Sequence, residues 1–171
     1  DVPEAGRYAK GKPIPSLVNL DENDFVTSVI SIKDFTDNKS LMFTTKKGVI
    51  KKTSLSEYAN PRKGGIRAVK LDQDDGLVCV ALVDEDSEIL LSTKNGMALR
   101  TKSNGIRAMG RGAGGVRGIR LSNDELVSMV VCGPGSTILT VTEHGFGKRS
   151  LIDEYRLIGR GGRGVTNIKS T

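Results

Sequence analysis

Aromatic side chains are scarce in this chain of 171 residues. Phe, Tyr and Trp together make up 4% of the residues, and tryptophan is missing. Proteins that bind single-stranded nucleic acids stack the bases on aromatic rings, so this composition argues against that class. Helical periodicity is also missing, and no apolar run approaches the roughly 18 residues that a membrane-spanning helix needs. These absences leave an all-β protein as the favoured fold class.

Histidine and cysteine are too few for the usual catalytic and metal sites. We interpret the single histidine, His144, as a turn residue because it directly precedes a glycine. Cys79 and Cys132 lack a Cys-x-x-Cys spacing, so we interpret them as buried, reduced cysteines of a cytosolic protein. The Asp-rich stretch 72–75 lacks the remaining ligands of a calcium loop. The sequence therefore predicts no catalytic residue, no metal site and no cofactor in this chain.

What the chain has instead is a repeat of about 49 residues. Three columns of identical residues line up when the copies are aligned. They are Gly48, Gly96 and Gly145; Arg62, Arg111 and Arg160; and Gly65, Gly115 and Gly164. The arginines are spaced by 49 and 49 residues. A period of this length is typical of propellers and solenoids, in which each unit buries its apolar face against its neighbours.

Each repeat predicts about four short strands, rich in Val, Ile, Leu and Thr and separated by turn residues. The expected strands are residues 26–32, 40–45, 49–53, 66–71, 77–83, 88–93, 97–101, 116–121, 126–132 and 137–142. Four strands in 45–50 residues is the size of a propeller blade. We therefore predict an all-β fold of β-propeller or β-pinwheel type, which forms a partial ring or open arc. Its expected parts are a partial blade at 1–45, blades at 46–93 and 94–142, and a partial blade at 143–171.

Basic and acidic residues are sorted within each repeat. Residues 46–70, 94–120 and 143–169 hold 21 Lys and Arg against 4 Asp and Glu, whereas residues 71–93 and 121–142 hold 9 acidic residues and no basic one. The net charge is +6. When repeats stack around an axis, such sorting produces a basic stripe on one rim. That stripe is the electrostatic footprint of a protein that follows a phosphate backbone.

Three segments, residues 61–67, 110–117 and 159–164, combine glycine with arginine at one register of the repeat. Glycine lets the backbone approach a phosphate, and the arginine fork matches phosphate oxygens. For any single segment, an equally good alternative is that the glycines serve only tight turns. Three copies favour phosphate contact, and the shortage of aromatic residues favours duplex DNA. The predicted phosphate-binding residues are Arg62, Lys63, Arg67, Arg111, Arg117, Arg160, Arg163, Lys51, Lys52, Arg100, Lys148 and Arg149.

Two stretches, residues 106–121 and 140–149, resemble the C-terminal domain of bacterial DNA gyrase A subunits, and residues 3–5 and 10–14 fit the same domain. The resemblance implies a six-bladed β-pinwheel whose basic rim wraps duplex DNA, in an ATP-dependent topoisomerase that introduces negative supercoils. It implies three partners, namely double-stranded DNA, the N-terminal catalytic part of the same polypeptide and the ATPase subunit of gyrase. It also implies a bacterial cytoplasmic protein associated with the nucleoid and not with a membrane.

The same resemblance implies a non-catalytic role, because the family's catalytic tyrosine, ATP site and magnesium ligands lie in other domains or subunits. The family's hallmark heptapeptide belongs to its first blade; residues 160–164 match five of its seven positions, but in a later repeat. Both ends of the chain fall within a repeat, so we expect a piece of a larger ring. Two alternatives stay open: the corresponding C-terminal domain of topoisomerase IV, and a propeller that serves as a protein-interaction platform.

Overall fold

The computed structural model describes residues 3–18, 20, 24–36, 38–62 and 64–169, and every regular element in them is a β-strand or a short 3-10 helix. The strands are β1 (Ser40–Thr45), β2 (Val49–Ser54), β3 (Leu77–Val83), β4 (Glu88–Thr93), β5 (Met97–Lys102), β6 (Val116–Arg117), β7 (Leu126–Cys132), β8 (Thr137–Val141), β9 (Gly147–Leu151) and β10 (Val165–Thr166). The 3-10 helices are η1 (Ile14–Ser16), η2 (Leu55–Tyr58), η3 (Ser103–Gly105) and η4 (Ile152–Glu154). The prediction of an all-β fold is confirmed.

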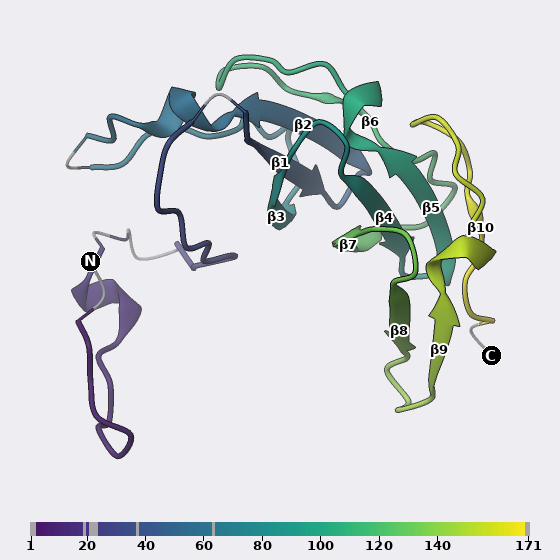
Figure 1. The fold of residues 1–171 in the computed structure, drawn as a ribbon, viewed down its shortest axis with the longest axis horizontal. Helices are drawn as coiled ribbons and strands as arrows, with labels where there is room; N and C mark the ends of the chain where they lie inside the picture. Colours follow the sequence, from purple (N-terminus) through teal and green to yellow (C-terminus); the bar gives the residue numbers. More distant parts are fainter. Residues whose placement is uncertain (1–2, 19, 21–23, 37, 63, 170–171) are drawn as a thin grey trace.

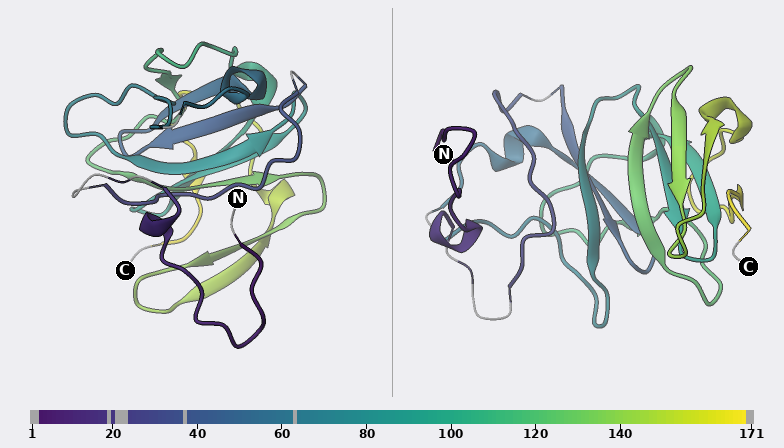
Figure 2. Two further views of the ribbon diagram at one scale, coloured as in Figure 1. Left: turned by 90° about the vertical axis from the view of Figure 1, so that its left-hand side faces the viewer. Right: turned by 90° about the horizontal axis from the view of Figure 1, so that it is seen from below.

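The strands form three antiparallel sheets that follow one another along an open arc (Figure 1). The first sheet has the order β3-β1-β2-β6, the second has the order β10-β5-β4-β7, and the third contains β8 and β9. Figure 2 shows the sheets as successive layers along the long axis of the molecule. The described residues between 3 and 36 lie at one end of the arc, outside the sheets (Figure 1). In the described part of the chain the layers do not close into a ring.

Each sheet is built around a hairpin with a glycine in its turn. The pairs β1–β2, β4–β5 and β8–β9 reverse direction at Gly48, Gly96 and Gly145, which have φ values of 76°, 78° and 80°. These are left-handed conformations that glycine adopts without a steric penalty. The first glycine column of the repeat therefore marks the hairpin turns. His144 lies in the last of these turns, as the sequence predicts.

The outer strand of each four-stranded sheet comes from the following repeat. β6 pairs with β2, where Val116 lies opposite Ile50, and β10 pairs with β5, where Val165 lies opposite Ala98. With the boundaries expected at residues 46, 94 and 143, each of these sheets combines strands from three consecutive repeats, because the hairpins cross those boundaries. β3 and β7 lie on the inner, concave side of the arc, and β6 and β10 lie on its outer side (Figure 1).

Apolar clusters between the layers hold the arc together. The cluster between the first and second sheets consists of Met42, Ile50, Val83, Ile89, Leu91, Leu99, Ile106, Ile119, Leu126 and Met129. Two smaller clusters cover the other faces of these sheets, and each contains one of the repeated tyrosines, Tyr58 and Tyr155. Burial of a large aliphatic side chain contributes about 1.5–3 kcal/mol, so these layers dominate the stability. The tyrosines are packing residues, which fits their spacing of two repeats.

Two expected strands do not form. Residues 26–32 and 66–71 contain apolar side chains that pack on the first sheet, including Ile30, Ile32, Ile66 and Ala68. They have no described strand beside them with which to form a ladder. The expected strand 116–121 shrinks to the two residues of β6. Apolar alternation in these segments therefore reflects burial of side chains rather than strand pairing.

The described residues contain no helix that could cross a membrane and no cluster of three or more His, Cys, Asp or Glu side chains that could hold a metal ion. Cys79 and Cys132 are free thiols that are half-buried, not fully buried as the sequence suggests. Desolvation by burial raises the pKa of both thiols. They therefore remain protonated, weak nucleophiles near neutral pH.

Candidate nucleic-acid interface

The three segments that combine glycine and arginine, residues 61–67, 110–117 and 159–164, are called the Gly/Arg loops below. They follow η2, η3 and η4, so each begins at the same point of its repeat. The second and third loops then run to β6 and β10, the outer strands of the two four-stranded sheets. All three Gly/Arg loops lie along the outer, convex side of the arc (Figure 1).

Glycine is required in the Gly/Arg loops where they approach a hairpin of the preceding repeat. Gly115 has a φ of 92°, and a Cβ atom there would lie 2.7 Å from the carbonyl oxygen of Ile50. Gly164 has a φ of 76°, and its Cβ would collide with the carbonyl oxygen of Ala98. Gly65, the first residue of this column, shares the left-handed conformation with a φ of 77° but has open space around it. Two of the three glycines therefore serve packing.

Most of the loop arginines point their charge to solvent. Arg62, Arg67, Arg117, Arg160 and Arg163 are exposed. Within the described residues, none of these five forms an ion pair, and only Arg160 donates a side-chain hydrogen bond, to the carbonyl oxygen of Arg117 over 3.4 Å. Unpaired guanidinium groups on a convex surface can bind phosphate oxygens without first breaking an internal contact. Lys63, the remaining loop residue predicted to bind phosphate, lies outside the described residues.

Arginines from two consecutive Gly/Arg loops line one shallow depression. Its walls are Asn60, Arg62, Gly65, Ile66, Arg67, Arg111 and Gly112. Arg62 and Arg67 come from the first loop and Arg111 from the second, so the depression spans the junction of two repeats. Arg111 is half-exposed, and its Nε lies 3.7 Å from a carboxylate oxygen of Glu57. Glu57 is a neighbour of this site that the charge pattern of the sequence does not single out.

The sequence predicts that Lys51 binds phosphate, and the structure corrects this. Its side chain is buried, with 1% of the residue exposed. The ammonium group donates hydrogen bonds to the carbonyl oxygens of Ala68, over 2.9 Å, and of Arg111. Desolvation by burial lowers the pKa of Lys51, the nearby charge of Arg111 lowers it further, and Glu57 raises it. Lys51 is part of the support of the depression, not of its surface.

Lys52 and Arg100, equivalent residues of two repeats, are also removed from the interface because they are 3% and 8% exposed. Lys52 donates to the carbonyl oxygen of Ser103 over 3.1 Å and pairs with Glu85 over 3.0 Å. Arg100 donates to the carbonyl oxygen of Ile152 over 2.9 Å and also contacts Glu88 at 2.7 Å, Asp153 at 3.3 Å and the carbonyl oxygen of Tyr155 at 3.3 Å. Ser103 and Ile152 are themselves equivalent, so each cation binds the first turn of the 3-10 helix in the next repeat. These contacts form a repeated junction between layers.

Lys148 and Arg149, the last predicted residues, are exposed on β9 at the far end of the arc. They are equivalent to Leu99 and Arg100 of the preceding hairpin and lie outside the Gly/Arg loops. Arg149 lies opposite Leu139, a side chain that is 70% exposed. Both side chains are therefore open to solvent, on a strand rather than in a Gly/Arg loop.

The acidic residues are used at the hairpin turns. The backbone N–H of Lys47 donates to Asp75 over 3.0 Å, and the backbone N–H of Asn95 donates to Asp124 over 3.0 Å. In each case an acidic turn satisfies an amide at the tip of a hairpin. In the described part of the chain, the ion pair between Arg111 and Glu57 is the one that involves a Gly/Arg loop. Lys52 and Arg100 pair with Glu85 and Glu88 of the acidic stretches, whereas the exposed loop arginines have no such partner among the described residues.

Comparison with known proteins identifies the family of this arc. The model of the DNA gyrase C-terminal domain, a beta-propeller family, matches residues 1–33, 39–84, 87–132 and 136–169. The DNA gyrase A subunit of Halalkalibacterium halodurans is 42% identical over 119 residues, which are 70% of this chain and 14% of that protein. The DNA gyrase A subunit of Lawsonia intracellularis is 43% identical over 120 residues, which are 70% of this chain and 15% of that protein.

Two solved C-terminal domains, one of topoisomerase IV and one of gyrase A, have a similar fold. The C-terminal domain of DNA topoisomerase IV has a TM-score of 0.84 and 31% identity, and the match covers 91% of this chain and 49% of that one. The DNA gyrase A C-terminal domain has a TM-score of 0.81 and 28% identity, with 91% and 52% covered. The chain thus spans about half of these solved domains and 14–15% of the two curated relatives. It belongs to the family of DNA gyrase A C-terminal domains.

Proposed function

We propose that this chain binds duplex DNA without sequence preference and bends it along the convex side of the arc. The observation that carries the proposal is the repetition of the Gly/Arg loops, which present arginines at one register in three consecutive repeats on one side of the molecule. Most of these arginines are exposed and have no acidic partner among the described residues. A curved row of unpaired arginines complements a curved row of phosphates.

Backbone contacts of this kind carry little sequence information, because arginine recognises the phosphate and not the base edge. Sequence enters through the deformability of the duplex. Smooth bending of a 20–30 bp site by 40–90° costs about 1–6 kcal/mol, and contacts along the arc must offset that cost. Flexible DNA is therefore bound better than stiff DNA of the same length.

Family membership supports a wider proposal for the protein to which this segment belongs. That protein is the A subunit of a bacterial DNA gyrase, an ATP-dependent topoisomerase that introduces negative supercoils in the cytoplasm. This segment is its non-catalytic DNA-handling part, without a cofactor of its own. It acts with the N-terminal catalytic part of the same polypeptide and with the ATPase subunit of gyrase. The corresponding domain of topoisomerase IV is the second candidate, supported by the TM-score of 0.84 to that domain.

A salt-dependent titration with a short duplex tests the proposal. We expect log K to fall linearly with log salt, with a slope of about −0.9 per phosphate contacted. Arg160→Ala should weaken binding and reduce the slope by about one, with little change in melting temperature. Lys33→Ala, which removes an exposed lysine at the end of the arc outside the Gly/Arg loops, is the matched control. A slope near zero for the unmodified chain would exclude the proposed function.

A further inference from the structure

We propose that the junction between the first two Gly/Arg loops is a composite site for a single DNA phosphate, in which Arg62 and Arg67 from one loop and Arg111 from the next bind the same group. The inference rests on the proposed function and makes it specific. It differs from a uniform basic rim, on which each arginine would meet its own phosphate. The shared depression that these three side chains line is the observation behind it.

The three arginines must be brought together across a repeat boundary, because Arg62 and Arg67 precede β3 whereas Arg111 follows η3. Three arginines that line one depression place like charges close to one another in the free protein. Glu57, whose carboxylate lies 3.7 Å from Nε of Arg111, offsets part of this repulsion. A phosphate carries its charge on oxygens that can accept from several guanidinium groups at once, so it satisfies the cluster better than a single carboxylate does.

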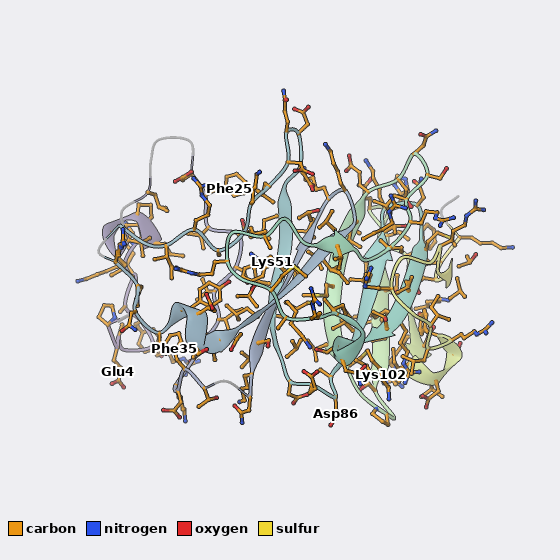
Figure 3. All side chains as sticks on the ribbon, turned by 90° about the horizontal axis from the view of Figure 1, so that it is seen from above. Glu4, Phe25, Phe35, Lys51, Asp86 and Lys102 are labelled. Atoms are coloured by element: carbon orange, nitrogen blue, oxygen red, sulfur yellow. The ribbon has the colours of Figure 1, made fainter. Side chains whose placement is uncertain are left out.

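Lys51 is the residue that joins the two loops. Its buried ammonium group donates to the carbonyl oxygen of Ala68, just beyond the first loop, and to that of Arg111 in the second loop. Figure 3 shows Lys51 near the centre of the molecule, away from the outline where other charged side chains extend. A buried cation that binds backbone carbonyls of two segments fixes their separation. Lys51 is therefore a positioning residue for Arg111 and not a ligand of the phosphate.

The neighbouring repeat has no ammonium group at this position. Leu99 occupies the position of Lys51 in the second repeat, where it is buried in the apolar cluster between the sheets. The second and third Gly/Arg loops are joined there without a lysine. The backbone N–H of Gly161 donates to the carbonyl oxygen of Gly118 over 2.6 Å. The backbone N–H of Arg120 donates to the carbonyl oxygen of Gly162 over 2.7 Å. Lys148 is the equivalent residue of the third repeat, but it is exposed, so the buried lysine is found at the first junction and not at the second.

A double-mutant cycle on the complete 171-residue chain tests the composite site, with a short duplex of mixed sequence as the probe. Arg62→Ala and Arg111→Ala should each weaken binding about tenfold at low salt. Because both act on one phosphate, the double variant should lose much less than the product of the two effects and should reduce the salt slope by about one in total. Arg62→Ala combined with Arg160→Ala, from distant loops, is the control and should be additive.

Lys51→Leu tests the positioning role, because Leu99 shows that a leucine fits the equivalent position of the second repeat. We expect a melting temperature close to that of the unmodified chain, weaker DNA binding, and no further loss when Arg111→Ala is added. Additive effects of Arg62→Ala and Arg111→Ala, with a steep salt slope in the unmodified chain, would overturn the composite site and leave DNA binding intact. If the unmodified chain showed no salt-dependent DNA binding, the proposed function itself would be excluded. If Lys51→Leu does not fold, the arginine cycle alone decides.

Discussion

Lys51 and Lys52 are consecutive residues of β2, so their side chains leave opposite faces of the strand. Both are nevertheless buried, because the first sheet is covered on both faces. A lysine in this setting loses hydration and must find acceptors inside the protein. Lys51 finds two backbone carbonyls, and Lys52 finds one carbonyl and a carboxylate. A charged residue in such a strand therefore connects neighbouring segments of the fold and does not belong to the surface.

Burial of Lys51 predicts a pH dependence of stability. Desolvation lowers its pKa in the folded state below the value in the unfolded chain, so the unfolded state binds more protons between these two values. The free energy of unfolding contributed by this residue therefore rises with pH in the alkaline range below the ordinary lysine pKa. Urea denaturation at a series of pH values should show that the free energy of unfolding of the unmodified chain rises relative to that of Lys51→Leu as the pH increases. Lys148→Leu, at the equivalent exposed position, is the control, and parallel curves for Lys51→Leu and the unmodified chain would contradict the prediction.

The exposed arginines could be located from the sequence, and the buried cations could not. Arg62, Arg111 and Arg160 recur beside glycines in segments without apolar alternation, which indicates loops, and the structure has them in loops. Lys52 and Arg100 recur too, but in strands, where the pattern of a single repeat does not tell whether a second layer covers them. Their shared burial depends on the neighbouring repeats, which is tertiary information. Repetition of a cation inside a strand is the signal that could have revealed them.

At the scale of elements, the contact between Arg100 and the next 3-10 helix should stabilise the junction of the layers. Arg100→Met leaves the nearly buried carboxylate of Glu88 without its partner, so we expect a loss of about 3–5 kcal/mol in the free energy of unfolding. Chemical denaturation measures this loss. Arg149→Met changes the equivalent, exposed residue of β9 and should cost less than about 0.5 kcal/mol. If Arg100→Met weakened DNA binding without a change in stability, we would conclude instead that Arg100 belongs to the DNA interface.

The approach of the second Gly/Arg loop to β2 should depend on one glycine. Gly115→Ala would place a methyl group 2.7 Å from the carbonyl oxygen of Ile50 at a φ of 92°, and we expect it to lower the melting temperature by several degrees. Gly112→Ala, in the same loop, meets no atom within 4 Å and is the matched control. Equal melting temperatures of these two variants would show that the loop can move away from β2 without cost.

Strands inside the hairpins could be predicted nearly to the residue, because apolar alternation and a turn glycine act together within a short stretch. β1 and β4 begin and end where the sequence predicts. The outer strands could not be predicted in this way, because β6 exists only through its pairing with β2 of another repeat. Residues 66–71 carry the same kind of pattern as residues 116–121, yet no described strand pairs with them. The local sequence pattern determines the strands of the hairpins, whereas pairing with another repeat determines the outer strands of the sheets.

At the scale of the whole molecule, the three Gly/Arg loops offer on the order of 4–7 phosphate contacts, one of which Arg62, Arg67 and Arg111 share. Such a number can bend a short duplex but cannot hold a complete turn of DNA against its stiffness. We therefore expect bending in a fluorescence energy transfer assay with end-labelled duplexes. In the same preparation, ligation of relaxed plasmid should trap little or no supercoil. Strong positive writhe trapped by the 171 residues would show that the arc, or an oligomer of it, wraps DNA unaided.

The exchange of outer strands between repeats also bears on how such arcs change during evolution. β6 completes the first sheet and β10 completes the second, although each belongs to the following repeat. If gene duplication inserted one more repeat, the outer strand of the inserted repeat would pair with the preceding sheet. The outer strand of the repeat after it would complete the new sheet. Every junction would be preserved, and one Gly/Arg loop would be gained. Duplication and loss could thus adjust the length of DNA held in whole-repeat steps.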